Sequence, residues 1–190
     1  MPLTRIDPNT ALIVIDLQKG LRGLLPAETF DPVITQSRAL ADAFRARSLP
    51  VVLVTANGVA PGRTEDAVRV HDLPPGFADV VDELDPQTGD LRVTKQTWGA
   101  FASTNIGEQL KALGVTQVVI TGVATSAEVE STARQAYEAG LNVTLAIDAM
   151  AERHDEMHDH SIAWIFPRLG ETGKTAEVLA LLARGGRASS

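Results

Sequence analysis

The chain has 190 residues, of which 44% are hydrophobic and 22% charged, and its formal net charge is −7. This composition is typical of a soluble globular protein, and the length suggests a single domain over residues 1–190 with a frayed tail at residues 185–190. No apolar run approaches the roughly 20 residues that span a bilayer, and no secretory signal is visible, so we expect a cytoplasmic protein. The acidic balance argues against nucleic-acid and membrane partners. Because the chain has no cysteine, it has no disulfide, no thiolate metal site and no thiol nucleophile.

Short apolar runs alternate with helical patterns along the first half of the chain. Residues 11–15 and 51–54 are apolar and β-branched, which is typical of buried parallel strands, and residues 32–49 between them have the spacing of an amphipathic helix. Residues 57–84 are rich in Gly, Pro and Asp, and we expect a long loop with one short helix there. Loops of this length are usually functional in compact domains.

The second half of the chain continues the alternation. Strands are expected at residues 91–94, 118–121 and 143–147, a turn at residues 122–125, and helices at residues 105–113, 126–139, 154–166 and 174–183. Strands that alternate with helices form βαβ units with right-handed crossovers. The sequence therefore predicts an α/β fold with a mostly parallel sheet that helices cover on both faces.

Polar residues follow three of the expected strands. They are Asp16, Lys95 and the turn that runs from Thr121 to Glu128. Ligands of parallel α/β sheets bind beyond the carboxyl ends of the strands, so these residues are the first candidates for a site. Taken alone, Asp16 could equally be a helix cap and Lys95 a solvated lysine.

The segment Gly122-Val-Ala-Thr-Ser-Ala-Glu-Val-Glu-Ser-Thr-Ala-Arg134 resembles the active-site segment of the isochorismatase-like hydrolases. This superfamily, also called the cysteine hydrolases, includes nicotinamidases, carbamoylsarcosine-type amidases and isochorismatases. Two further segments occur in the family's order: Asp16-Leu-Gln follows the first strand, and Lys95 precedes Trp98-Gly-Ala-Phe101. The resemblance therefore covers roughly residues 11–182.

The resemblance implies a three-layer α/β/α fold with a Rossmann-like, doubly wound sheet, and a homo-oligomer (a dimer or higher). It implies that Asp16 and Lys95 are two members of a catalytic triad. It also implies a cis peptide between Val123 and Ala124, where main-chain N–H groups meet a substrate oxygen. Val123, Ala124 and Thr125 are accordingly expected to bind substrate.

Glu128 occupies the position that corresponds to the family's nucleophilic cysteine. A covalent thioester is impossible without a thiol, and the resemblance is closer to the isochorismatase branch, which hydrolyses a vinyl ether without a covalent enzyme intermediate. Such hydrolysis begins with protonation of the enol carbon and leaves an oxocarbenium ion that water captures. The resemblance thus implies a hydrolase for a small carboxylated substrate, and Asp16 is the candidate acid.

Three roles for Glu128 stay open. It can be a working carboxylate whose charge, close to Asp16, raises one of the two pKa values. It can form a salt bridge with Lys95 that blocks an inactive pocket, or it can point away. The corresponding alternatives for function are a catalytically silent ligand-binding member of the same fold and a non-thiol amidase in which Glu128 activates water.

The remaining candidates have weaker signals. Gln18 is expected to orient Asp16 or bind substrate, Arg63 to hold a substrate carboxylate, and Trp98 to line the pocket or pack in the core. Thr64 could instead cap a short helix that begins at Glu65.

A group of histidines near the C-terminus has a spacing that zinc can use. His154 and His158 are four residues apart, which places both on one face of a helix, and His160 is nearby. A polar turn at the surface also explains these histidines, and no strand end supplies a third ligand. We expect no metal and no other cofactor.

Overall fold

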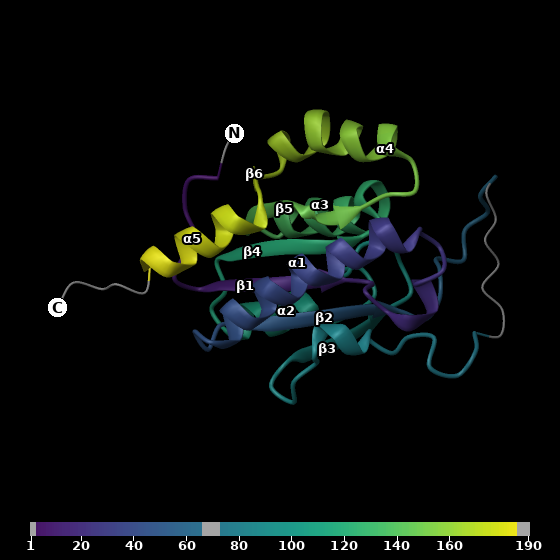
Figure 1. The fold of residues 1–190 in the computed structure, drawn as a ribbon, viewed down its shortest axis with the longest axis horizontal. Helices are drawn as coiled ribbons and strands as arrows, with labels where there is room; N and C mark the ends of the chain where they lie inside the picture. The colour runs from purple at the N-terminus through teal and green to yellow at the C-terminus, as the bar shows by residue number, and fades with distance from the viewer. Residues whose placement is uncertain (1–2, 66–72, 186–190) are drawn as a thin grey trace.

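The computed structural model describes residues 3–65 and 73–185. At its centre, six parallel strands form one sheet in the order β3-β2-β1-β4-β5-β6 (Figure 1). The strands are β1 (Thr10–Ile15), β2 (Val51–Ala56), β3 (Leu91–Lys95), β4 (Gln117–Val123), β5 (Asn142–Ala151) and β6 (Glu171–Gly173). The order reverses between β1 and β4, which is the point where doubly wound sheets place their ligands.

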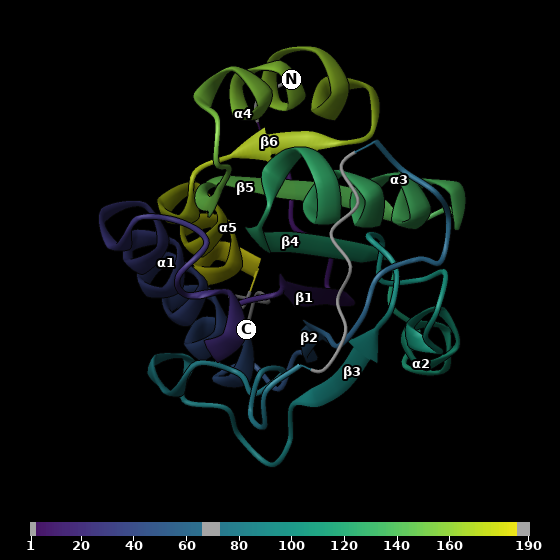
Figure 2. The same cartoon turned by 90° about the vertical axis from the view of Figure 1, so that its right-hand side faces the viewer.

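Helices cover both faces of the sheet. They are α1 (Ala27–Arg45), α2 (Ile106–Ala112), α3 (Glu130–Glu138), α4 (Asp155–His160) and α5 (Thr175–Gly185). Figure 2 shows α1 and α5 on one side of the strands and α2 and α3 on the other. The predicted three-layer, doubly wound α/β/α fold is therefore confirmed.

The central strand β1 supplies side chains to both halves of the core. Leu12 and Val14 belong to the hydrophobic cluster beneath α1 and α5, and Ala11, Ile13 and Ile15 belong to the cluster beneath α2 and α3. Every residue of β1 is buried because side chains alternate between two covered faces. This explains why the strand reads as a continuous apolar run.

The predicted start of the first helix was wrong. Proline marks the first position of many helices, so residue 32 was a reasonable boundary, but α1 begins at Ala27 and Pro32 lies inside it. The carbonyl of Pro26 accepts hydrogen bonds from the N–H groups of Thr29 and Phe30. This additional turn brings Phe30, which is fully buried, into the core.

Several other boundaries differ from the sequence prediction. The expected turn at residues 122–125 is partly strand, because β4 continues to Val123, and β5 continues past Asp148 to Ala151. The Asp148 carboxylate accepts hydrogen bonds from the N–H and hydroxyl of Thr175 and so caps α5. The short strand β6 was missed, since its three residues form no apolar run.

The two predicted helices at residues 126–139 and 154–166 are each interrupted. A π-helical turn at Thr125–Val129 precedes α3, and a π-helical turn at Ser161–Ile165 and a 3₁₀ turn at Phe166–Arg168 follow α4. π-Helical turns are frequent at functional sites. The first of them contains Glu128.

The expected long loop between β2 and β3 contains a 3₁₀ turn at Asp82–Leu84. The helix considered from Glu65 onward falls on residues 66–72, which lie outside the described ranges. No helix in the described part of the chain is both long and apolar enough to cross a membrane.

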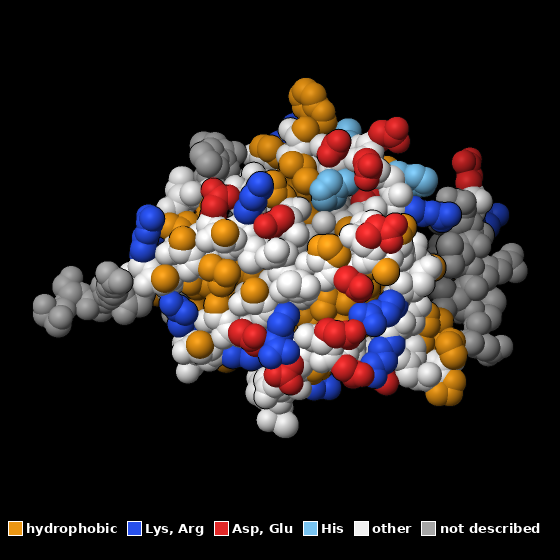
Figure 3. All heavy atoms as spheres, in the orientation of Figure 1, with side chains coloured by type: hydrophobic (Ala, Val, Ile, Leu, Met, Phe, Trp, Pro, Cys, Tyr) orange, Lys and Arg blue, Asp and Glu red, His pale blue; other side chains and the backbone are white. Residues whose placement is uncertain are grey.

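The face that α1 forms carries charges of both signs close together (Figure 3). Arg38 pairs with Asp42 and Asp85, and Arg22 pairs with Glu83, so α1 and the segment before it are tied to the loop that follows β2. Exposed ion pairs of this kind contribute little stability each.

Candidate active site

Asp16 and Lys95 form a buried ion pair at the carboxyl edge of the sheet. Asp16 directly follows β1, and Lys95 is the last residue of β3. Because β2 lies between these strands, the lysine side chain reaches across it, and its Nζ donates a hydrogen bond of 2.6 Å to Asp16 Oδ2. Both residues are 1% exposed. The structure thus brings together the first two residues of the expected triad.

The two oxygens of the Asp16 carboxylate differ in their contacts. Among the described residues, Oδ1 is buried and has no hydrogen-bond partner. Burial raises the pKa of Asp16 to about 7, with a smaller contribution from the negative charge of Glu128, while the charge and hydrogen bond of Lys95 oppose the rise. A carboxyl group with this pKa can both give and accept a proton near neutral pH.

The backbone just before Asp16 and the end of β4 lie close together. Gly122 in β4 is opposite Ile15 in β1, with a φ of +119°, and a Cβ at this position would overlap the carbonyl oxygen of Ile15. Only glycine permits this approach. It holds the end of β4 against the last residue of β1, directly before Asp16.

The peptide between Val123 and Ala124 is cis, as expected. The N–H of Ala124 donates a hydrogen bond of 2.9 Å to Oε2 of Glu128, four residues later in the π-helical turn. This contact corrects one of the roles considered for Glu128, because among the described residues Glu128 forms no ion pair with Lys95 within 4.0 Å. Its carboxylate turns back toward the end of β4, and its negative charge contributes to the raised pKa of Asp16.

Residues that follow β5 hold the same turn from outside. Glu152 Oε2 accepts hydrogen bonds from the N–H and the hydroxyl of Ser126, at 3.0 and 2.7 Å. The hydroxyl of the buried Thr125 lies 2.8 Å from Nδ1 of His158, which comes from α4. We name Glu152 and His158 the brace. The role of the brace was not evident from the sequence, because neither residue stands at a predicted strand end.

The other candidate residues are placed as follows. Gln18 is buried, and its amide bonds to the backbone of Ala56 and Phe77 at the end of β2 and in the following loop. Its side chain therefore fixes the backbone beside the site and makes no hydrogen bond to the Asp16 carboxylate, whereas its backbone N–H donates a hydrogen bond of 2.9 Å to the Asp16 carbonyl oxygen. Trp98 is 59% exposed, so it does not pack in the core. Arg63 is exposed in the loop after β2 and has no hydrogen bond to Asp16, Lys95 or Glu128.

The structure shows no group of three or more His, Cys, Asp or Glu side chains that could hold a metal ion within the described ranges. Of the three histidines considered, His158 is engaged with Thr125.

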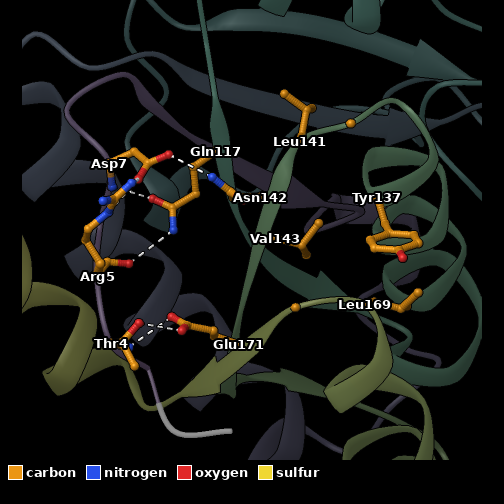
Figure 4. A pocket seen from close by; sticks show the side chains of 12 residues that line it. Thr4, Arg5, Asp7, Gln117, Tyr137, Leu141, Asn142, Val143, Leu169 and Glu171 are labelled. Atoms are coloured by element: carbon orange, nitrogen blue, oxygen red, sulfur yellow. Dashed lines mark hydrogen bonds and ion pairs between the residues drawn. The ribbon is translucent and has the colours of Figure 1, made fainter.

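A cavity of about 410 Å³ lies elsewhere, at the amino ends of β4, β5 and β6 (Figure 4). Its polar side chains bond to one another: Asp7 accepts from Arg5 and Asn142, and Gln117 bonds to the backbone of Asp7 and Arg5. These groups tie the N-terminal segment to the sheet. The candidate catalytic pair Asp16 and Lys95 lies at the opposite, carboxyl edge of the sheet.

The chain is similar to known proteins over most of its length. A family model described as the isochorismatase domain matches residues 10–177. The uncharacterized isochorismatase family protein YwoC of Bacillus subtilis is 36% identical, over 90% of this chain and 93% of its own. The structure of an isochorismatase family protein of Burkholderia thailandensis has a TM-score of 0.90 and 36% identity, over 94% of this chain and 98% of its own.

A further relative carries the name of a specific enzyme. Nicotinamidase 3 of Arabidopsis thaliana is 31% identical, over 82% of this chain and 81% of its own. The match of the family model to most of the chain, together with these relatives, shows that this protein belongs to the isochorismatase family of the cysteine hydrolase superfamily.

Proposed function

We propose that the protein hydrolyses a small carboxylated molecule by the vinyl-ether route, with Asp16 as the proton donor and with no covalent enzyme intermediate. The observation that carries the proposal is the state of Asp16. Among the described residues its Oδ1 is buried without a hydrogen-bond partner, and its pKa is raised to about 7, so the carboxyl group can hold a proton for a substrate near neutral pH. The chain has no thiol to act as a nucleophile.

Asp16 gives one proton to the substrate and takes another from water. Asp16 transfers its proton to the enol carbon of the substrate, which leaves an oxocarbenium ion and an ionised Asp16 that the Lys95 ammonium stabilises. A water molecule adds to the cationic carbon and returns one proton to Asp16. The resulting hemiketal separates into a ketone and an alcohol, and the enzyme is restored.

Lys95 can serve the substrate as well as Asp16. Its ammonium group has three donors, and the one hydrogen bond described for it goes to Asp16 Oδ2. The two other N–H groups are suited to a substrate carboxylate. We therefore expect the carboxylated part of the substrate to lie against Lys95.

A second candidate is amide hydrolysis. It is favoured by the similarity to a protein named a nicotinamidase and by the carboxylate of Glu128 close to Asp16, which could activate water. In this proposal, as in the first, Glu128 stands where the family has its cysteine. The vinyl-ether route is the better supported, because the Glu128 carboxylate is already bonded to the Ala124 N–H.

The test is a comparison of two substrates with the purified protein. Isochorismate releases pyruvate when its vinyl ether is hydrolysed, and nicotinamide releases ammonia. We expect enzyme-dependent release of pyruvate and no release of ammonia. Ammonia without pyruvate would establish the amidase instead, and the absence of both products would count against the vinyl-ether proposal and favour a ligand-binding role.

A further inference from the structure

The turn after β4 has two backbone N–H groups bonded to carboxylates of the protein itself. The Ala124 N–H bonds to Glu128, and the Ser126 N–H bonds to Glu152. Both N–H groups lie at the beginning of the helical stretch that starts at Thr125. Free N–H groups in such a position attract anions, since the helix dipole is positive there. Here the protein's own carboxylates already satisfy them.

The charges around Asp16 give this occupancy a chemical consequence. Lys95 and Asp16 form one buried ion pair. Glu128 adds a further negative charge, which contributes to the raised pKa of Asp16. A negative group beside the reacting atoms disfavours a second negative charge and favours a positive one. The side chain of Glu128 therefore acts against an oxyanion and for a carbocation.

We propose that Glu128 is a specificity-determining residue. Its carboxylate holds the anion-binding N–H of Ala124, so the site rejects substrates that place a carboxylate or a developing oxyanion there. It accepts substrates whose reacting carbon becomes positively charged. The second half of this inference rests on the proposed vinyl-ether function, whereas the occupancy of the Ala124 N–H does not. The Glu128 carboxylate also directs the carboxylate of the substrate to Lys95 and away from the turn.

The occupancy of the Ala124 N–H by the Glu128 carboxylate is tested with ¹⁵N-labelled protein and with acetate as the probe. The backbone amide resonance of Ala124 is followed during acetate titration of the wild type, Glu128→Gly and Glu128→Gln. We expect a saturable shift in Glu128→Gly, where the carboxylate is gone, and none in the wild type. Glu128→Gln should also show none, because the side-chain carbonyl still accepts the Ala124 hydrogen bond.

The matched control is Glu138→Gly, which removes an exposed carboxylate from the end of α3. It shares the loss of charge and the cost of a glycine in a helix, and its Ala124 amide should not respond to acetate. An equal response of Ala124 in the wild type and in Glu128→Gly would overturn the inference. So would the lack of a saturable response in a folded Glu128→Gly.

The wild type provides a measurement that does not depend on the folding of any variant. As pH is lowered, the amide proton of Ala124 should shift with the same midpoint as the side-chain carboxyl carbon of Glu128. Independent midpoints would show that the two groups are not bonded and would overturn the inference.

The specificity half is tested by the rate of pyruvate release from isochorismate. Glu128→Gln keeps the shape and the hydrogen bond but removes the charge, so kcat should fall by roughly tenfold or more while the acetate response stays absent. An unchanged kcat would overturn this half. If the wild type itself releases no pyruvate but the acetate results hold, the proposed function fails and the occupancy of Ala124 stands.

Discussion

Lys95 and Asp16 form a contact of 2.6 Å between two strand ends that a third strand separates. The lysine neutralises a carboxylate that the surrounding protein has almost completely removed from water. Even so, the effect of burial on the Asp16 pKa outweighs the effect of the lysine. The pair therefore differs from a permanent salt bridge, because one partner titrates near neutral pH.

The first prediction concerns the proton on Asp16. Asp16→Asn keeps the size of the side chain but can neither give nor take a proton, so turnover should fall by about 10²–10⁴, the usual contribution of such a group. Pyruvate release from isochorismate measures the loss. Asp31→Asn, a change at an exposed position of α1, is the matched control and should retain wild-type turnover. A fully active Asp16→Asn enzyme would remove Asp16 from the mechanism.

The second prediction concerns stability and pH. The pKa of Asp16 is about 7 in the folded protein and 3.8 when unperturbed, so between these values the folded state binds more protons than the unfolded state. The contribution of Asp16 to the free energy of unfolding is fully present below about pH 4. It is lost as pH rises to about 7, and the loss amounts to at most roughly 4 kcal/mol. The free energy of unfolding of the wild type relative to Asp16→Asn should therefore decrease over this interval. Urea unfolding at a series of pH values measures it, and a difference that is constant with pH would contradict the raised pKa.

The third prediction concerns Lys95. Lys95→Met removes the positive charge and the hydrogen bond that oppose the effect of burial, so the pKa of Asp16 should rise further, by about one unit or more. The side-chain carboxyl carbon of Asp16, followed by NMR, reports this directly. Lys111→Met on α2 is the control, since it removes a lysine outside the site. If Lys95→Met left the titration of Asp16 unchanged, the lysine would not be its electrostatic partner.

Much of this fold was predictable because its signals are local. The run Ala11–Ile15 is apolar on both faces, as a central parallel strand requires, and the polar residue that follows it lies at the sheet edge where ligands bind. The same reasoning places Lys95 at the end of β3. The resemblance of the Gly122–Arg134 segment to the family then linked these separate strand ends to one site.

The features that sequence analysis missed depend on contacts between distant residues. Glu152 follows a strand that runs four residues past its predicted end, so neither its position nor its bond to Ser126 was evident. The bond from the Ala124 N–H to Glu128 requires the π-helical turn, which apolar periodicity does not distinguish from an ordinary helix.

The last prediction concerns the brace. Glu152→Ala leaves the N–H and hydroxyl of the half-buried Ser126 without their acceptor, which should cost about 1–3 kcal/mol and loosen the turn that carries Glu128. Glu152→Gln keeps an acceptor oxygen, so it should recover part of this loss. Glu156→Ala on α4 is the control, because it removes an exposed glutamate from the same segment. The free energy of unfolding and the amide resonance of Ala124 are measured for all three variants. If Glu152→Ala matched Glu156→Ala in both measurements, Glu152 would not position the turn.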